Sequence, residues 1–140
     1  MAERVFVDTN VFVYADDDDS AHKRERARAV LAELIPDNRA VISTQIMQEF
    51  FVVATRKLGI PKERARRRVE ALARLNVVLV RPELVLSAID LHRLHSLSFW
   101  DALVIRSAAS AGCARLLSED LQHGQEIDSV RIENPFAAGI

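Results

Sequence analysis

Val5-Phe6-Val7-Asp8-Thr9-Asn10 is the stretch that decides the fold, because three apolar residues give way at once to three polar ones. A short run that is apolar on both faces is typical of a strand buried within a sheet. Asp8 then stands where that strand ends, and open parallel sheets bind ligands at the carboxyl ends of their strands. An Asp in this place can also simply cap the following helix. The choice depends on whether later strands bring further carboxylates to the same edge.

The composition is that of an ordinary globular protein, with 140 residues of which 49% are hydrophobic and 28% charged. We therefore expect one domain over residues 1–140. The single cysteine, Cys113, excludes an internal disulfide and a Cys-rich zinc site. No apolar run approaches the ~20 residues of a membrane span, and the N-terminus lacks a signal-peptide pattern. We expect a cytoplasmic protein with no membrane partner.

The net charge of -1 argues against a uniformly basic nucleic-acid binder, but the charges are unevenly distributed. Segments 23–28 and 56–68 hold most of the lysines and arginines, whereas Asp16 to Asp19 form an uninterrupted acidic run. The local field therefore matters more than the total charge for a charged ligand. We interpret the acidic run as a solvated loop and assign it no function.

Strands and helices are expected to alternate along the whole chain. Further strands are predicted at Ala40–Ser43, Val77–Val80, Ala114–Ser118 and Ser129–Ile132, and those at Ala40–Ser43 and Val77–Val80 are expected to be buried. Helices are predicted after the N-caps Ser20 and Thr44, from Pro61 to about Leu75, from Pro82, and from Ser98 to Gly112. This order predicts an α/β fold, a three-layer α/β/α sandwich with a central, mainly parallel sheet.

Four acids stand at or near the predicted carboxyl edge of this sheet: Asp8, Glu49, Asp101 and Asp120. Carboxylates about 5 Å apart repel each other by on the order of 3 kcal/mol per pair at an effective dielectric near 20. Such a cluster makes sense only with bound cations or with some acids protonated. All-oxygen ligands suit Mg²⁺ or Mn²⁺, and a carboxylate-held Mg²⁺ is well suited to phosphodiester hydrolysis.

The sequence also resembles a known family, the PIN domain, with the closest likeness to VapC-type toxins of toxin–antitoxin pairs. The resemblance spans nearly the whole chain and rests on four motifs in order and spacing. They are Val5-Phe6-Val7-Asp8-Thr9-Asn10, Gln48-Glu49-Phe50, Phe99-Trp100-Asp101-Ala102-Leu103 and Leu116-Leu117-Ser118-Glu119-Asp120. All four acids of the family pattern are present.

This resemblance implies a Mg²⁺-dependent endoribonuclease that cleaves RNA with metal-activated water. It implies that the four acids bind the metal (Mg²⁺ or Mn²⁺), and that Asn10 and Ser118 orient these ligands. It further implies an RNA substrate, a cognate antitoxin and a homodimer. Two alternatives stay open from the sequence, namely a solitary RNA-processing nuclease and a non-catalytic module that binds RNA or an antitoxin. A phosphatase with an aspartyl-phosphate intermediate is disfavoured, because Asn10 stands where such enzymes need a second acid.

Two further features have more than one interpretation. Arg66, Arg67 and Arg68 spread around a predicted helix and either contact RNA phosphates or form an ordinary solvated face. Trp100, beside Asp101, either stacks on a base or packs in the core or a dimer contact, and we expect the second.

Overall fold

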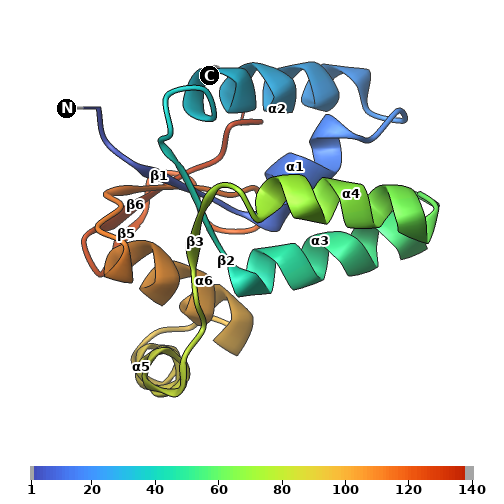
Figure 1. The fold of residues 1–140 in the computed structure, drawn as a ribbon. Coiled ribbons are helices and arrows are strands. Elements are labelled where there is room, and N and C mark those ends of the chain that lie inside the picture. The colour runs from blue at the N-terminus through green and yellow to red at the C-terminus, as the bar shows by residue number, and fades with distance from the viewer. Residues whose placement is uncertain (1, 138–140) are drawn as a thin grey trace.

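The computed structural model describes residues 2–137, which form six strands and six helices; a pair of helices follows each of the first three strands, and the last three strands follow one another (Figure 1). The strands are β1 (Val5–Val7), β2 (Ala40–Ser43), β3 (Asn76–Val78), β4 (Arg115–Leu117), β5 (Glu126–Ile127) and β6 (Val130–Glu133). The helices are α1 (Thr9–Ala15), α2 (Ala21–Leu34), α3 (Thr44–Arg56), α4 (Lys62–Leu72), α5 (Pro82–Leu94) and α6 (Phe99–Ser110). Each predicted helix is present, and the alternation is as the sequence indicates.

All six strands join one sheet in the order β3-β2-β1-β4-β6-β5. Every neighbouring pair is parallel except β5 and β6. β1 lies in the middle, where Val5 pairs with Ala40 of β2 on one side and with Arg115 of β4 on the other. The predicted mainly parallel sheet is confirmed.

The helices cover both faces of this sheet. From β1 the chain proceeds to β2 and β3 toward one edge of the sheet, and helices α1 to α4 lie in these connections. From β3 it crosses back over β1 to β4 through α5 and α6. Because crossovers are right-handed, reversing the direction places the second set of helices on the opposite face. Figure 1 shows α5 and α6 on the other side of the sheet from α2. The three-layer α/β/α sandwich is therefore confirmed.

The core is built from the strands that the sequence marks as apolar. All residues of β1 and β2 are buried, and so are Leu116 and Leu117 of β4. At roughly 25 cal/mol per Å² of apolar surface, strands buried on both faces contribute strongly to folding. Among residues 2–137 no helix is long and apolar enough to cross a membrane.

The prediction of a third fully buried strand was wrong. β3 is an edge strand whose three residues are only half-buried, and it starts at Asn76 rather than Val77. Asn76 extends the strand because its amide Nδ2 donates to the carbonyl oxygens of Asn38 and Ala40, at 3.1 and 3.0 Å. These contacts stabilise the edge, where apolar burial is weaker.

Other boundaries also differ from the prediction. Ser43 rather than Thr44 is the N-cap of α3, and the Thr44 hydroxyl instead accepts from Val80 N at 3.2 Å. α4 ends at Leu72, before the predicted Leu75. The short β5 was missed because it is only 2 residues long. Its hairpin with β6 turns through Asp128 and Ser129, both with φ near +60° (55° and 63°), a conformation typical of type I′ turns.

Candidate active site

The functional edge of the sheet lies where β1 and β4 end. After β1 the chain adds β2 and β3 on one side of β1, and it later adds β4 on the other side. The strand order therefore reverses between β1 and β4. In open α/β sheets ligands bind outside the carboxyl ends of the strands at such a switch point. Asp8 N donates to Leu117 O at 2.9 Å, which continues the β1–β4 ladder into the segments that carry Asp8 and Asp120.

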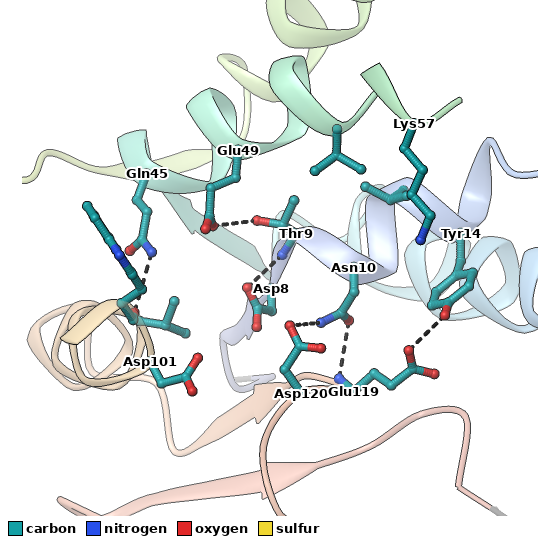
Figure 2. Close-up of a pocket in the computed structure, with 14 residues that line it drawn as sticks. Asp8, Thr9, Asn10, Tyr14, Gln45, Glu49, Lys57, Asp101, Glu119 and Asp120 are labelled. Carbon is teal, nitrogen blue, oxygen red and sulfur yellow. Dashed lines mark hydrogen bonds between the residues drawn. The ribbon is translucent and has the colours of Figure 1, made fainter. Parts of the chain in front are cut away.

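A hollow of about 240 Å³ opens at this edge, and all four predicted acids line it (Figure 2). They arrive on different elements: Asp8 after β1, Glu49 on α3, Asp101 in the first turn of α6 and Asp120 after β4. Segments far apart in the sequence thus bring their carboxylates to one place. Figure 2 shows Glu49 pointing from its helix toward Thr9 and Asp8, with Asp120 next to them.

Asp8 is the most deeply placed of the four, with only 5% of its surface exposed. Its Oδ1 accepts from Thr9 N at 2.8 Å, as the N-cap of α1, and its Oδ2 accepts from the Ser118 hydroxyl at 2.7 Å. Burial raises the pKa of Asp8 from 3.8 to about 7, although these two hydrogen bonds act to lower it. The charges of Glu49 and Asp120 add to the rise. Asp8 therefore caps a helix and also belongs to the carboxylate cluster.

Glu49 and Asp101 are half-buried and also hold their protons more tightly than in water. The Thr9 hydroxyl donates to Glu49 Oε1 at 2.9 Å, yet burial raises the pKa of Glu49, helped by the charges of Asp120 and Asp101. Burial likewise raises the pKa of Asp101, and Asp120 adds to it. The Ser98 hydroxyl caps α6 by accepting from Asp101 N at 3.0 Å, which orients the turn that carries this acid.

Asn10 and Ser118 contact the carboxylates that the resemblance assigns to them. Asn10 Nδ2 donates to Asp120 Oδ2 at 3.3 Å, and Asn10 Oδ1 accepts from Glu119 N at 3.2 Å. The Ser118 hydroxyl, besides donating to Asp8, accepts from Asp120 N at 3.2 Å. The two residues therefore hold the loop after β4 against the loop after β1.

The donors around the hollow fit a hard divalent cation. They are all oxygens, as Mg²⁺ and Mn²⁺ prefer, and the raised pKa values of three of them show that burial and mutual repulsion disfavour their ionised forms. As the side chains of residues 2–137 stand, no three His, Cys, Asp or Glu groups are close enough to share one ion. Ligation of one ion by three acids therefore requires some of these side chains to move.

One end of the hollow is lined by Tyr14, Lys57 and Glu119, none of which the sequence predicts as a site residue, and Lys23 contacts this group. Lys23 Nζ lies 2.6 Å from Glu119 Oε2, and the Tyr14 hydroxyl donates to Glu119 Oε1 at 2.7 Å. Burial alone would raise the pKa of Glu119, but these two donors lower it. Lys57 is the only cation among the described residues that line the hollow. Its position inside a basic stretch of sequence gave no signal for this role.

The three arginines that either contact RNA or form a solvated face lie away from the hollow. Arg66 pairs with Glu70 on the same helix, Arg68 Nη2 lies 3.0 Å from Asp16 Oδ1, and Arg67 is exposed on α4. None of the three lines the carboxylate hollow. The Asp16–Asp19 run supplies the partner of Arg68, and its Asp18 pairs with Arg24 at 2.8 Å.

The expectation that Trp100 packs in the core was wrong. The indole is 60% exposed and lines the hollow beside Asp101. Phe99, its neighbour on the helix, is half-buried and packs against the core in its place.

Comparison with known proteins agrees with this architecture. The PIN domain family model matches residues 5–125. No curated protein matches the chain significantly in sequence. Among solved structures, a DNA-bound VapBC from Salmonella typhimurium is similar with a TM-score of 0.69 and 20% identity, over 96% of this chain and 99% of that one.

Two further solved structures share the fold. A toxin–antitoxin complex from Klebsiella pneumoniae has a TM-score of 0.67 and 17% identity, over 94% of this chain and 98% of that one. VapC20 from Mycobacterium tuberculosis, described as a toxin that cleaves the sarcin–ricin loop, has a TM-score of 0.63 and 19% identity, over 80% and 86%. At such identities the structures establish the fold, while the family model covers most of the sequence. On these grounds the chain belongs to the PIN domain family.

Proposed function

We propose that this protein is a metal-dependent endoribonuclease and the toxin of a toxin–antitoxin pair. The observation that carries the proposal is the meeting of Asp8, Glu49, Asp101 and Asp120 around one hollow at the strand-order switch of the sheet. An anionic phosphodiester is repelled by bare carboxylates, so a substrate of this kind enters such a site only together with cations. The all-oxygen donor set fits Mg²⁺ or Mn²⁺.

The four acids would hold the cation, and when bound it lowers the pKa of water and neutralises charge on phosphate oxygens. The other residues of the site position these acids. Ser118 and the backbone N–H of Thr9 fix the Asp8 carboxylate, while Asn10 fixes Asp120. Lys57, at the far end of the hollow, presents a positive charge to an RNA phosphate.

The assignment as a toxin is supported by the solved relatives of the same fold, which are a VapC toxin and toxin–antitoxin complexes. On this proposal a cognate antitoxin binds the protein and the RNA target lies in the cytoplasm. A homodimer, as the family resemblance implies, is part of the same proposal. Expression without an antitoxin is then expected to arrest growth.

The test is cleavage of single-stranded RNA by the parent protein and by Asp101→Asn, in Mg²⁺ and in chelator. This substitution removes one charge but keeps the backbone N–H of Asp101, from which the Ser98 cap accepts. Asp90→Asn is the matched control, because Asp90 is an exposed acid on α5 that does not line the hollow. We expect chelator and Asp101→Asn each to lower the cleavage rate by orders of magnitude, and Asp90→Asn to leave it unchanged.

Growth arrest is the second readout of the same variants. The arrest caused by the parent should disappear with Asp101→Asn and persist with Asp90→Asn. Equal cleavage by parent and Asp101→Asn would overturn the nuclease assignment. Cleavage without growth arrest would instead indicate a solitary RNA-processing enzyme.

A further inference from the structure

We propose that the indole of Trp100 is a stacking platform for an unpaired base of the RNA, next to the phosphate that enters the carboxylate hollow. This inference rests on the proposed function, because it names how the same site holds its substrate. It specifies a substrate that is single-stranded where it is bound. Three structural observations support it.

The first observation is exposure. Trp100 is the only tryptophan of the chain, and 60% of its surface is open to solvent. Tryptophan contributes to stability by burying a large apolar surface, so an indole left open at a site calls for a binding partner. The exposed leucines Leu86 and Leu94 lie on α5 and do not line the hollow.

The second observation is position. Trp100 immediately precedes Asp101 and lines the same hollow as the four acids. Gln45 Nε2 donates to the Trp100 main-chain oxygen at 3.4 Å, which places Trp100 at the Gln45 end of the hollow. Figure 2 shows Gln45 and Lys57 at opposite ends, and they are twelve residues, roughly 18 Å, apart along α3. The carboxylates therefore lie between an aromatic face and a lysine.

The third observation is that the platform is held in place. The Phe99 ring packs against the indole in an edge-to-face arrangement, with centroids 5.1 Å apart and planes at 76°. Phe99 is itself half-buried against the core, and the Ser98 cap fixes the turn that carries both rings. A side chain that is ordered before binding loses little conformational entropy when a ligand stacks on it.

The surroundings favour a nucleobase over other occupants. A base is neutral and flat, so it approaches a carboxylate-lined site without electrostatic repulsion, and every base offers a π-face for stacking. A second hollow of about 380 Å³ shares Asp101 and Asp120 with the first, and its other lining residues include both polar and apolar side chains, among them Ser96, Gln122 and Leu97. A single strand thus has room to continue past the acids on the side of Asp101.

The experiment uses the fluorescence of this sole tryptophan. The Asp101→Asn protein, which we expect not to cleave, is titrated in Mg²⁺, so that cations can enter the hollow with the RNA, with a single-stranded decamer of adenylate and with the same decamer annealed to its complement. We expect the single strand to quench the emission to saturation and the duplex to quench it far less. Equal quenching by the duplex, or no quenching by the single strand, would overturn the proposal.

Further variants, made on the Asp101→Asn background and measured in Mg²⁺, give the contribution of the ring, with binding followed by the anisotropy of a labelled decamer. Trp100→Ala should weaken binding roughly 5- to 150-fold, as expected for the loss of one base–aromatic stack, and Trp100→Phe should restore part of it. Leu94→Ala, another exposed apolar residue, is the control and should bind like Asp101→Asn alone. Unchanged binding by Trp100→Ala would reject the platform.

Two controls separate the possible failures. A blue shift of the emission with rising protein concentration, without RNA, would show that a second copy covers the indole, and this would overturn the proposal. If the parent cleaves RNA and Asp101→Asn does not, while Trp100→Ala binds normally, the platform is rejected and the nuclease assignment stands. If Asp101→Asn cleaves like the parent, the nuclease assignment itself is rejected.

Discussion

Asp8 shows how one side chain carries a structural and an electrostatic role together. Its two oxygens accept from Thr9 N and Ser118, so its geometry is fixed, yet its burial makes the ionised form costly. Leaving a buried charge with incomplete compensation costs stability, and a bound cation removes that cost. The residue is therefore expected to link folding, protonation and metal binding.

The first prediction at this scale is a pH dependence of stability without metal. The folded pKa of Asp8, about 7, lies above its ordinary value of 3.8, so between these values the folded protein binds more protons than the unfolded chain. The contribution of protonated Asp8 to the free energy of unfolding is complete below about pH 4 and is lost as the pH rises through about 7. Glu49 and Asp101 act in the same direction, whereas Glu119 and Glu133, whose pKa values are lowered, act in the opposite direction below their ordinary range.

Asp8→Asn measures this effect by denaturant unfolding in chelator. At pH 8 the variant should be more stable than the parent by about 1–3 kcal/mol, because one charge is removed from a repelling group. The difference should shrink toward pH 5, and saturating Mg²⁺ should shrink or reverse it, since the parent then gains binding free energy. Equal stability at every pH, with equal gains from Mg²⁺, would contradict a cation-binding role for Asp8.

At the scale of elements, the site depends on where helices begin. Asp8 is the N-cap of α1, Ser98 is the N-cap of α6 and α3 starts directly after β2, so each of these helices leads away from the carboxyl edge. The first turns therefore hold Thr9, Asn10, Gln45 and Asp101 around the hollow. Glu49 lies one turn further along α3 and reaches back to the Thr9 hydroxyl.

The sequence predicts these elements to different extents, for physical reasons. β1, β2 and β4 were predictable because strands buried on both faces read as apolar runs, and the acids at their ends follow from the parallel topology. β3 was predicted as buried because its valines look the same at an edge as in the centre. Lys57 and Tyr14 were not predictable as neighbours, because they meet only through the packing of α1 against α3. Trp100 and Phe99 are adjacent in sequence, and only the packed structure shows which of the two faces solvent.

The prediction for α4 concerns its arginines. If this helix contacts RNA, replacing Arg66, Arg67 and Arg68 by Glu should weaken binding and lower the logarithmic salt slope by roughly 0.7 per lost phosphate contact. Lys57→Ala is the comparison, because Lys57 lines the hollow itself and should lose about one contact. The measurement is RNA affinity between low and high salt, in chelator.

The arginines would be placed on a solvated face if the triple variant kept the parent's salt dependence of RNA affinity while Lys57→Ala showed a weaker one. Because Arg66 and Arg68 also form ion pairs with Glu70 and Asp16, the thermal stability of the triple variant must be measured in parallel. Exposed pairs of this kind contribute at most about 1 kcal/mol each, so the variant should still fold.

At the scale of the whole molecule, the sheet and both helical layers share one continuous core. This arrangement predicts a single domain that unfolds in one cooperative step. Calorimetry should give an unfolding enthalpy of about 100 kcal/mol near 60 °C, equal to the van't Hoff value. Two transitions, or a van't Hoff enthalpy well below the calorimetric one, would contradict the single domain.

The insertion of β4 beside β1 also has a consequence for biosynthesis. The hydrogen bond between Ser118 and Asp8 joins residues 110 positions apart. β1 leaves the ribosome first, but the carboxylate of Asp8 gains this bond only after β4 has been synthesised. Contacts of such long range form late, because the loop between them must first close. On the proposed function, a nascent chain that ends before β4 already carries three of the acids but has no assembled site. On that proposal, nuclease activity cannot begin before the closing strands have been added.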